Sequence, residues 1–341
     1  MADTFVSIII PCRNEEKFIG KCLESLIKQD YPKDSFEVLV IDGGSEDGTR
    51  KVAGGYASKY SFIKIWDNPQ KFTPFALNIG IKNARGEVII RMDSHADYKS
   101  DYISECLKYL EEYKADNVGG IIKTLPKEKT PWAKAIAYSL SSFFGVGTSH
   151  FRLGSKKPRW VDTVFGGCYR KEVFDRVGLF NEKMIRGQDI EFNRRLKRAG
   201  GKILLVPNIV AYYYPQATIT NFWKHNFTDG FWTIYPLQFG IKIFSWRHLL
   251  PLFFVSGLII LLFLSLFSNF FSGVLKTVVF IYIAASFYFA FKIIPQKKDF
   301  KVFFLIPVAF AARHIGYGLG SLSGLIDFVS KKYGRKKAKG N

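Results

Sequence analysis

Short apolar runs alternate with amphipathic stretches through about the first 215 residues of the chain. The runs are rich in β-branched residues, as buried strands are: FVSIII (5–10), FEVLVI (36–41), FIKIW (62–66) and EVIIRM (87–92). Apolar positions with helical spacing follow the first run, and further helices are expected from Thr49 and from Thr73. This alternation predicts an α/β domain in which a mostly parallel sheet is flanked by helices.

Polar loops follow three of these runs, at residues 11–16, 42–49 and 93–97. In a parallel α/β sheet, ligands bind at the carboxyl ends of the strands. A dinucleotide-binding domain would need GxGxxG after the first strand, where this chain has PCRNEE, and the P-loop pattern GxxxxGK[ST] does not occur. The phosphates of a nucleotide would therefore have to be neutralised in another way, and a metal ion held by acidic loops is the natural candidate.

The loop RMDSHADY carries the strongest chemical signal in this part of the chain. Asp93, His95 and Asp97 stand at every second position, so in an extended or turn conformation their side chains can converge on one cation. A histidine beside carboxylates suits Mn²⁺ somewhat better than Mg²⁺. The alternative is that Asp and Ser in this loop only cap the following helix.

After Arg247, charge nearly disappears over long intervals. Residues 249–267 contain no charged side chain and would span roughly 28 Å as a helix, close to the thickness of a bilayer core. Residues 274–291 predict a second membrane helix. A third apolar region, 302–329, is interrupted by Pro307, by Arg313 and His314, and by glycines, and we expect it to be embedded in the membrane.

Loop charges predict the orientation in the membrane. Positive residues lie between the second and third apolar regions (Lys292, Lys297, Lys298 and Lys301) and again in the tail KKYGRKKAKGN, which places both segments on the cytoplasmic side. Both can be cytoplasmic only if residues 302–329 turn back as a re-entrant or hairpin element. The N-terminal sequence MADTFVSIII lacks a basic region typical of a signal peptide, so we expect a multi-pass inner-membrane protein whose catalytic domain is cytoplasmic.

An aromatic residue recurs every four positions just before the first span, at Trp223, Phe227, Phe231 and Tyr235, with basic residues interspersed. This pattern is typical of a helix at the membrane interface, although the aromatic side chains could instead pack on the catalytic domain. The expected organisation is a catalytic domain (1–215), an interfacial segment (216–247), transmembrane or re-entrant helices (248–330) and a basic cytoplasmic tail (331–341).

The charge composition of the chain narrows the chemical class of its binding partner. Lys and Arg number 49 against 29 Asp and Glu, a net charge of +20, which favours phosphate, anionic lipid or nucleic acid. We do not expect nucleic acid, because much of the excess flanks membrane segments and no recognition motif accompanies it. The four cysteines are scattered without CxxC spacing, which favours reduced thiols packed as small apolar groups over disulfides or a zinc site.

Four segments, in this order and at these distances, resemble the family 2 glycosyltransferases with the GT-A fold: IIIPCRNEE (8–16), VLVIDGGSEDGT (38–49), ALNIGIKNARGEVIIRMDSHADY (76–98) and GQDIEFNRRLKRAGG (187–201). The DSHA form and the tail sequence RHIGYGLG more narrowly resemble bacterial succinoglycan-type exopolysaccharide glycosyltransferases.

The resemblance implies that the first loop and the end of the second strand surround the base and ribose of a nucleotide sugar, through Pro11, Arg13, Glu15 and Asp42. It also implies that two residues of an AxNxG stretch, Asn78 and Gly80, lie near this donor. Gly166 and Gly167 would lie beneath the acceptor, unless they form an ordinary strand-to-helix turn.

Asp93 and His95 occupy the family's DxD position, which implies a divalent cation, Mn²⁺ or Mg²⁺, on the donor diphosphate. The spacing adds Asp97 as a third ligand. Gln188 replaces the first acid of the family's ED motif, and Asp189 is the retained carboxylate, implied to be the base that deprotonates the acceptor hydroxyl. The alternative is that Asp189 only begins the helix 190–200 and is stabilised by its dipole.

The expected function is that of a membrane-anchored, metal-dependent inverting transferase. It would move a hexose from a nucleoside diphosphate sugar to a lipid-linked (polyprenyl) saccharide in exopolysaccharide or surface-glycan assembly. The QxxRW motif of processive synthases does not occur, so single addition is expected. Two alternatives stay open: polyprenyl phosphate itself as the acceptor, and a catalytically inactive nucleotide-sugar-binding scaffold of a glycan complex.

Overall fold

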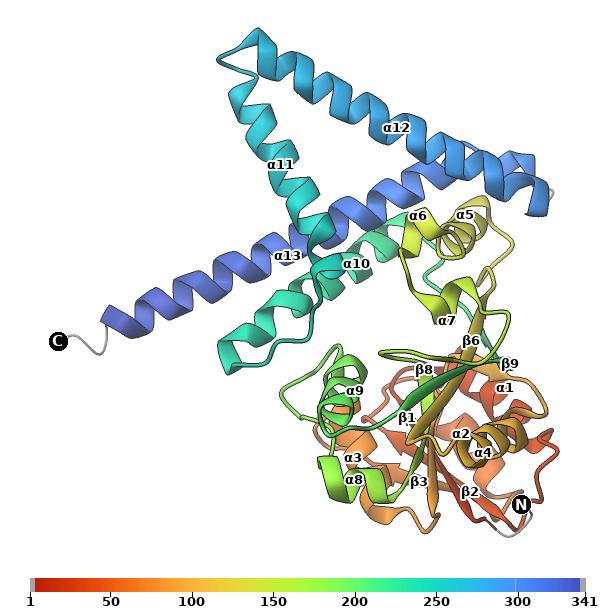
Figure 1. Ribbon diagram of the computed structural model, residues 1–341. Coiled ribbons are helices and arrows are strands. Elements are labelled where there is room, and N and C mark those ends of the chain that lie inside the picture. Colours follow the sequence, from red (N-terminus) through yellow and green to blue (C-terminus); the bar gives the residue numbers. More distant parts are fainter. Residues whose placement is uncertain (1–3, 298, 338–341) are drawn as a thin grey trace. The chain divides into compact units, whose positions relative to one another are not determined.

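The computed structural model describes residues 4–297 and 299–337 (Figure 1). The chain forms two units, each with its own internal contacts. We call residues 4–123 and 150–213 the sheet unit, and residues 124–149 with the described residues from 214 onward the helical unit.

The sheet unit begins with the strand and helix alternation that the sequence predicts. Its strands are β1 (Val6–Cys12), β2 (Phe36–Asp42), β3 (Ile63–Asp67), β4 (Val88–Arg91), β5 (Ala96–Tyr98), β6 (Asn117–Thr124), β7 (Arg159–Trp160), β8 (Phe165–Arg170) and β9 (Ile203–Tyr213). Its helices are α1 (Glu16–Ile27), α2 (Thr49–Ala57), α3 (Thr73–Asn83), α4 (Tyr102–Glu112), α7 (His150–Leu153), α8 (Glu172–Val177) and α9 (Gln188–Arg198).

The strand order is β3-β2-β1-β4-β8-β6-β9-β5, with β7 beside β9. Strands β3, β2, β1 and β4 are parallel, as predicted. From β8 onward the sheet is mixed, because β8 runs antiparallel to β4 and to β6, and β9 runs antiparallel to β5 and to β7. The α/β class is therefore confirmed, and the antiparallel part is an addition that the strand and helix alternation of the first half did not indicate.

Both faces of the sheet are covered, which explains why its strands are apolar throughout. Ile8 and Ile10 pack with α1, α2 and α4 on one face, whereas Ile9 packs with α3, α8 and α9 on the other. Neighbouring residues of a strand point to opposite faces, so a continuous apolar run is what two buried faces require.

The helical unit contains α5 (Pro131–Ser139), α6 (Phe143–Val146), α10 (Ile219–Ile234), α11 (Leu250–Leu264), α12 (Asn269–Lys297) and α13 (Leu305–Lys337), with short 3₁₀ helices at Tyr235–Phe239, Trp246–Leu249 and Phe300–Val302. Residues 124–149 thus pack with the C-terminal helices although they interrupt the sheet unit in sequence. Lys134 Nζ on α5 lies 2.7 Å from Asp299 Oδ2, and the Arg313 guanidinium donates to the carbonyl oxygen of Gly145 and to Asn226 Oδ1.

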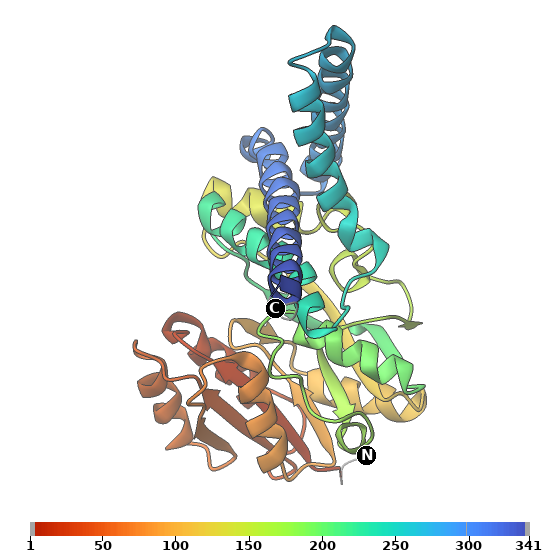
Figure 2. The ribbon, with the colours of Figure 1, turned by 90° about the vertical axis from the view of Figure 1, so that its left-hand side faces the viewer.

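The predicted reversal within residues 302–329 is wrong. Residues Leu305–Lys337 form one uninterrupted helix, α13, which lies along α10 (Figure 1 and Figure 2). The glycines that suggested a break are instead contact points: Gly316, Gly320 and Gly324 face the backbone oxygens of Trp223, Phe227 and Phe231. Small residues at this spacing let two helix backbones approach closely.

Helices occur where the first two membrane spans are predicted. Within the described residues, Trp246–Leu264 and Asn269–Pro295 are long and apolar enough to cross a membrane, by length and composition. Only 11% and 22% of their apolar windows are buried, which is not the burial of a core helix. Lys298, one of the charges used for the orientation, and residues 338–341 of the basic tail lie outside the described residues.

Candidate functional site

A pocket of about 270 Å³ opens at the carboxyl ends of β1 and β4 in the sheet unit. Several residues that the sequence proposed for the site line it: Pro11, Arg13, Glu15, Asp93, His95 and Gln188. They come from the end of β1 and the loop after it, the turn after β4 and the start of α9, so the fold brings three distant segments to one place.

Arg91, the last residue of β4, faces both Asp93 and Asp189, the carboxylates that the sequence proposed for the cation and for the base. Its Nη2 donates to Asp93 Oδ1 at 3.2 Å, and its Nη1 lies 3.9 Å from Asp189 Oδ2. The Arg91 side chain is 11% exposed, against 19% for Asp93 and 34% for Asp189, so only the carboxylates reach solvent to any extent. Burial alone would lower the pKa of Arg91. The nearby carboxylates of Asp93 and Asp189 more than offset this effect, so the pKa of Arg91 lies above the ordinary value.

Asp189 lies in the first turn of α9, after Gly187, which caps the helix in the left-handed conformation. Its Oδ1 accepts a hydrogen bond from the Ile190 backbone N–H at 2.9 Å. A carboxylate in the first turn interacts favourably with the helix dipole, which is the alternative structural role expected for this residue. Its Oδ2 faces Arg91, so Asp189 lies next to a residue that lines the pocket, although Asp189 itself is not part of the lining.

His95 is held by a residue from a distant loop. Its Nδ1 lies 3.2 Å from Glu15 Oε1, which connects the loop after β1 to the turn after β4. The backbone of Asp93 is also fixed, because its N–H donates to the Tyr98 hydroxyl at 2.7 Å. The turn that carries Asp93 and His95 is therefore supported from both sides.

Asp97 does not join this group, which corrects the predicted three-residue ligand set. The chain turns at Ser94 and His95 and enters β5, where Asp97 pairs with Lys21 at 2.5 Å. Across the described residues, no three His, Cys, Asp or Glu side chains are placed to hold a metal ion. Spacing in sequence suggested convergence, but the Asp97 carboxylate is paired with Lys21 instead.

The remaining donors still fit a cation that is shared with a ligand. Asp93 offers carboxylate oxygens and His95 an imidazole, and both line the pocket. Mg²⁺ in nucleotide sites is bound by one or two protein carboxylates, with phosphate and water oxygens completing the shell, and imidazole is also acceptable to Mn²⁺. A full protein cage is therefore not needed.

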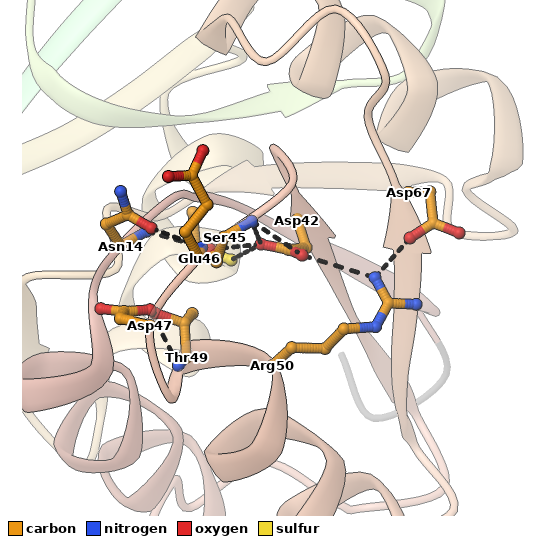
Figure 3. A network of polar contacts seen from close by, with 9 residues as sticks. Asn14, Asp42, Ser45, Glu46, Asp47, Thr49, Arg50 and Asp67 are labelled. Atoms are coloured by element: carbon orange, nitrogen blue, oxygen red, sulfur yellow. Dashed lines mark hydrogen bonds and ion pairs between the residues drawn. The ribbon is translucent and has the colours of Figure 1, made fainter.

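Asp42 organises the loop after β2 rather than lining the pocket (Figure 3). It is buried, and its Oδ1 accepts hydrogen bonds from the Ser45 hydroxyl at 2.5 Å and from the Ser45 backbone N–H at 3.2 Å. Arg50 Nη1 lies 3.4 Å from its Oδ2. Asn14, in turn, accepts from the Glu46 backbone N–H, so this loop is tied to the pocket loop that follows β1.

The cysteines are all free and buried, as predicted. Cys12 lies at the pocket, where burial, Asp42 and Glu15 raise the pKa of its thiol to about 12. A thiol that stays protonated at neutral pH is a poor nucleophile and metal ligand.

Asn78 and Gly80 have structural explanations. Asn78 is buried; its Nδ2 donates to the Phe180 carbonyl at 2.9 Å and to Glu182 Oε1 at 3.0 Å, and its Oδ1 accepts from the Phe180 N–H at 2.9 Å. A side chain at Gly80 would meet Ile9 at 2.5 Å, so this glycine lets α3 pack on β1. Neither residue lines the pocket at β1 and β4.

Gly166 and Gly167 lie inside β8 and not in a strand-to-helix turn. Their φ angles are +68° and +119°, a conformation that favours glycine. A Cβ atom at Gly166 would lie 2.9 Å from the carbonyl oxygen of Arg91, so this glycine lets β8 pass beside the end of β4.

Sequence reasoning missed several pocket residues, among them the buried polar residues Asn68 and Arg91. Asn68 follows β3, and within the described residues its Oδ1 has no hydrogen-bond donor, while its Nδ2 donates to the Phe72 carbonyl at 3.0 Å. Arg91 had a signal that could have been used: it is a charged residue at the end of an otherwise apolar buried strand, which requires a partner. Asn68 had no comparable signal.

Comparison with known proteins agrees with this architecture. The family described as glycosyl transferase family 2 matches residues 7–178. A Methanococcus voltae protein, dolichyl N-acetyl-alpha-D-glucosaminyl phosphate 3-beta-D-2,3-diacetamido-2,3-dideoxy-beta-D-glucuronosyltransferase, is 36% identical over 234 residues, which cover 66% of this chain and 72% of that protein. Succinoglycan biosynthesis protein ExoA of Rhizobium meliloti (strain 1021) is 28% identical over 276 residues, covering 74% of this chain and 82% of that protein.

Among solved structures, a mannosyltransferase from Pyrobaculum calidifontis, in complex with GDP-Man and Mn²⁺, aligns with a TM-score of 0.63. The alignment covers 94% of this chain and 87% of that chain at 18% sequence identity. At this identity the likeness shows a shared fold, and the GT-A expectation for the sheet unit is confirmed.

Proposed function

We propose, since this chain belongs to glycosyl transferase family 2, that it moves a hexose from a nucleoside diphosphate sugar to a lipid-linked saccharide. The observation that carries the proposal is the Arg91 cluster: Asp93 and Asp189, one proposed for the cation and one for the base, approach the same guanidinium at the pocket. A carboxylate that lines the pocket and a second one that faces the same guanidinium can act on the two ends of a single transfer.

The chemistry proposed for Asp189 is that of a general base. Its carboxylate takes the proton of the acceptor hydroxyl while the acceptor oxygen attacks the anomeric carbon from the face opposite the diphosphate. The new carbon–oxygen bond forms as the bond from the anomeric carbon to the phosphate oxygen breaks, and the electron pair leaves with the nucleoside diphosphate. The configuration at the anomeric carbon inverts.

Negative charge develops on the diphosphate as it leaves, and in this proposal that charge is offset next to Asp93. We propose that Asp93 and His95 hold Mn²⁺ or Mg²⁺ there, and such a cation, when bound, stabilises the departing diphosphate as a Lewis acid. Lys71 and Arg13 also line the pocket and supply positive charge for phosphate oxygens. The Pyrobaculum calidifontis mannosyltransferase was solved with Mn²⁺, which supports a divalent cation in this fold.

The donor's nucleoside is proposed to contact the part of the pocket formed by Pro11, Glu15 and Asn68. The unpaired Oδ1 of Asn68 can accept a hydrogen bond from a base N–H, and a buried acceptor without a donor costs about 1–3 kcal/mol, so a ligand donor would be favoured. Solved structures of related fold carry GDP-Man or UDP-GlcNAc, which supports a nucleotide sugar without selecting the base.

The acceptor is proposed to be membrane-bound. The exposed apolar side chains of α11 and α12, among them Phe253, Phe263 and Phe280, suit lipid rather than water. A relative from Methanococcus voltae is named for a dolichyl-phosphate-linked substrate. We therefore propose a multi-pass inner-membrane protein, with the sheet unit on the cytoplasmic side and α10 at the interface, acting in surface-glycan or exopolysaccharide assembly.

One experiment tests the proposal. The full chain, purified in detergent, is incubated with a panel of nucleotide sugars, Mn²⁺ or Mg²⁺, and either polyprenyl-linked saccharides or polyprenyl phosphate, and the release of nucleoside diphosphate and the lipid product are measured. Cation-dependent transfer of one sugar to a lipid-linked saccharide supports the proposal. A monosaccharide phospholipid as product would replace it by transfer to polyprenyl phosphate, and donor binding without transfer would replace it by a scaffold role.

A further inference from the structure

Arg91 has more donors than the protein uses. A guanidinium carries five N–H donors, and the hydrogen bond that the structure gives Arg91 goes from Nη2 to Asp93. Its Nε and Nη1 are buried and have no hydrogen-bond partner among residues 4–297 and 299–337. Nη1 instead faces Asp189 at 3.9 Å, too far for a hydrogen bond and close enough for a strong charge interaction.

The position of Arg91 is fixed by the sheet. Residue 91 ends β4 and pairs in register with Ile9 of β1, while Gly166 of β8 passes beside its carbonyl oxygen. The guanidinium is therefore anchored on rigid strands, whereas Asp93 lies in a turn and Asp189 in the first turn of α9. A cation anchored on the sheet between two carboxylates from separate segments can set where both of them stand.

We propose that Arg91 is a positioning residue that sets the separation and orientation of Asp93 and Asp189. This rests on the proposed function, which gives these carboxylates their roles. Two anionic side chains at one pocket repel each other, and a planar guanidinium between them offsets the repulsion while its fork directs one donor group toward each. Through Arg91, the proposed cation ligand Asp93 is linked to the proposed base Asp189.

The surroundings of Arg91 favour this role over direct binding of the donor. Carboxylates face the guanidinium on two sides, so a diphosphate at Arg91 would also meet the charges of Asp93 and Asp189. The more accessible cation Arg13 lines another part of the same pocket and is better placed for phosphate, since its side chain is 38% exposed.

Steady-state kinetics of two variants test the inference. Arg91→Gln removes the charge and the fork, and we expect kcat to fall about 100-fold, with the KM for the donor changed less than about threefold. Arg91→Lys keeps the charge but reaches one carboxylate at a time, and we expect it to recover only part of the loss. Arg170→Gln is the matched control, because Arg170 on β8 pairs with Glu111 away from the pocket and should keep the wild-type kcat.

The kinetic outcomes that overturn the inference are specific. A kcat within about threefold of wild type in Arg91→Gln would show that the carboxylates need no such link. A KM for the donor raised tenfold or so at unchanged kcat would make Arg91 a donor ligand. Full recovery in Arg91→Lys would show that charge alone matters and that the fork does not.

A second measurement does not depend on activity. The thermal midpoint of the full chain in detergent is measured for Arg91→Gln, Asp189→Asn and the double variant. If Arg91 and Asp189 interact, each single change removes the same contact, so the two shifts should fail to add by about 1 °C or more. Additive shifts overturn the inference by themselves. If the wild type transfers no sugar from any donor, the proposed function fails, whereas coupled shifts would still support the contact between the two residues.

Discussion

Asp189 Oδ2 lies 3.9 Å from Arg91 Nη1, although the two residues come from α9 and from the end of β4. Through Arg91, which lines the pocket and also binds Asp93, two carboxylates that are far apart in the sequence face the same guanidinium. Without this contact, Asp189 would be one more acidic residue in the first turn of a helix. With it, the residue is a candidate for the base of a transfer reaction.

Asp189→Asn should lower turnover by at least about 100-fold and leave donor binding nearly intact, because the amide keeps the shape of the side chain but cannot accept the proton. Initial rates and calorimetric binding of the nucleotide sugar measure the two effects. Asp175→Asn, in the first turn of α8, is the matched control and should behave like the wild type. Turnover within tenfold or so of wild type would place the base elsewhere.

Asp93→Asn should raise the concentration of Mn²⁺ or Mg²⁺ needed for half-maximal activity by about tenfold or more, since it removes an anionic ligand from the pocket. Asp97→Asn should leave that concentration unchanged, because Asp97 pairs with Lys21. Cation titrations of the initial rate compare the two variants. Equal effects of both substitutions would restore Asp97 to the ligand set.

Asn78→Ala should lower the thermal midpoint while the KM for the donor stays within about threefold, because Asn78 fixes the backbone of Phe180 rather than a ligand. Loss of these buried hydrogen bonds should cost about 2 kcal/mol. The exposed Asn83 on the same helix provides a control in Asn83→Ala. A large rise in KM at an unchanged midpoint would make Asn78 a donor contact.

Glu37→Gln should destabilise the sheet unit at neutral pH by about 1–3 kcal/mol. Glu37 is buried, and burial favours its neutral form. Hydrogen bonds from the Arg85 N–H and the Ser7 hydroxyl outweigh this effect and lower the pKa of Glu37 below the ordinary value of 4.5. A lowered folded-state pKa gives stability above the unfolded pKa, and this stability is lost as pH falls through the folded pKa.

The difference in thermal midpoint between wild type and Glu37→Gln should therefore be largest near neutral pH and shrink below about pH 4. Glu24→Gln, on the exposed side of α1, is the control. A difference that does not change with pH would mean that the charge of Glu37 contributes nothing.

Gly320→Ala should destabilise the helical unit, although alanine is normally favoured over glycine in a helix by about 1 kcal/mol. A Cβ atom at residue 320 would lie 1.9 Å from the carbonyl oxygen of Phe227, so α10 and α13 would have to separate, at about 1–3 kcal/mol. Gly273→Ala on α12 is the control, since a Cβ there meets no atom within 4 Å. Thermal unfolding in detergent should show opposite signs for the two variants.

Local patterns in the sequence were enough for the parallel half of the sheet, the pocket loop after β1, the two apolar helices and the buried thiols. Each rests on a property that neighbouring residues carry themselves: β-branched runs, helical periodicity, or a length of apolar chain that matches a bilayer. The loops with Pro11, Glu15 and Asp93 could be assigned to one edge because strand ends in a parallel sheet share an edge, whereas Gln188 was assigned from the family resemblance.

Only the tertiary structure decided which partners individual side chains have. Arg91 stands between two carboxylates, Asn78 faces Phe180, and Asp97 turns away to Lys21, and each outcome depends on residues brought together from distant segments. The continuity of α13 was decided in the same way, because Gly320 looks like a helix breaker until α10 occupies the space beside it. Periodicity reports which face of an element is buried, but the identity of the neighbour on that face is set by how the chain folds back on itself.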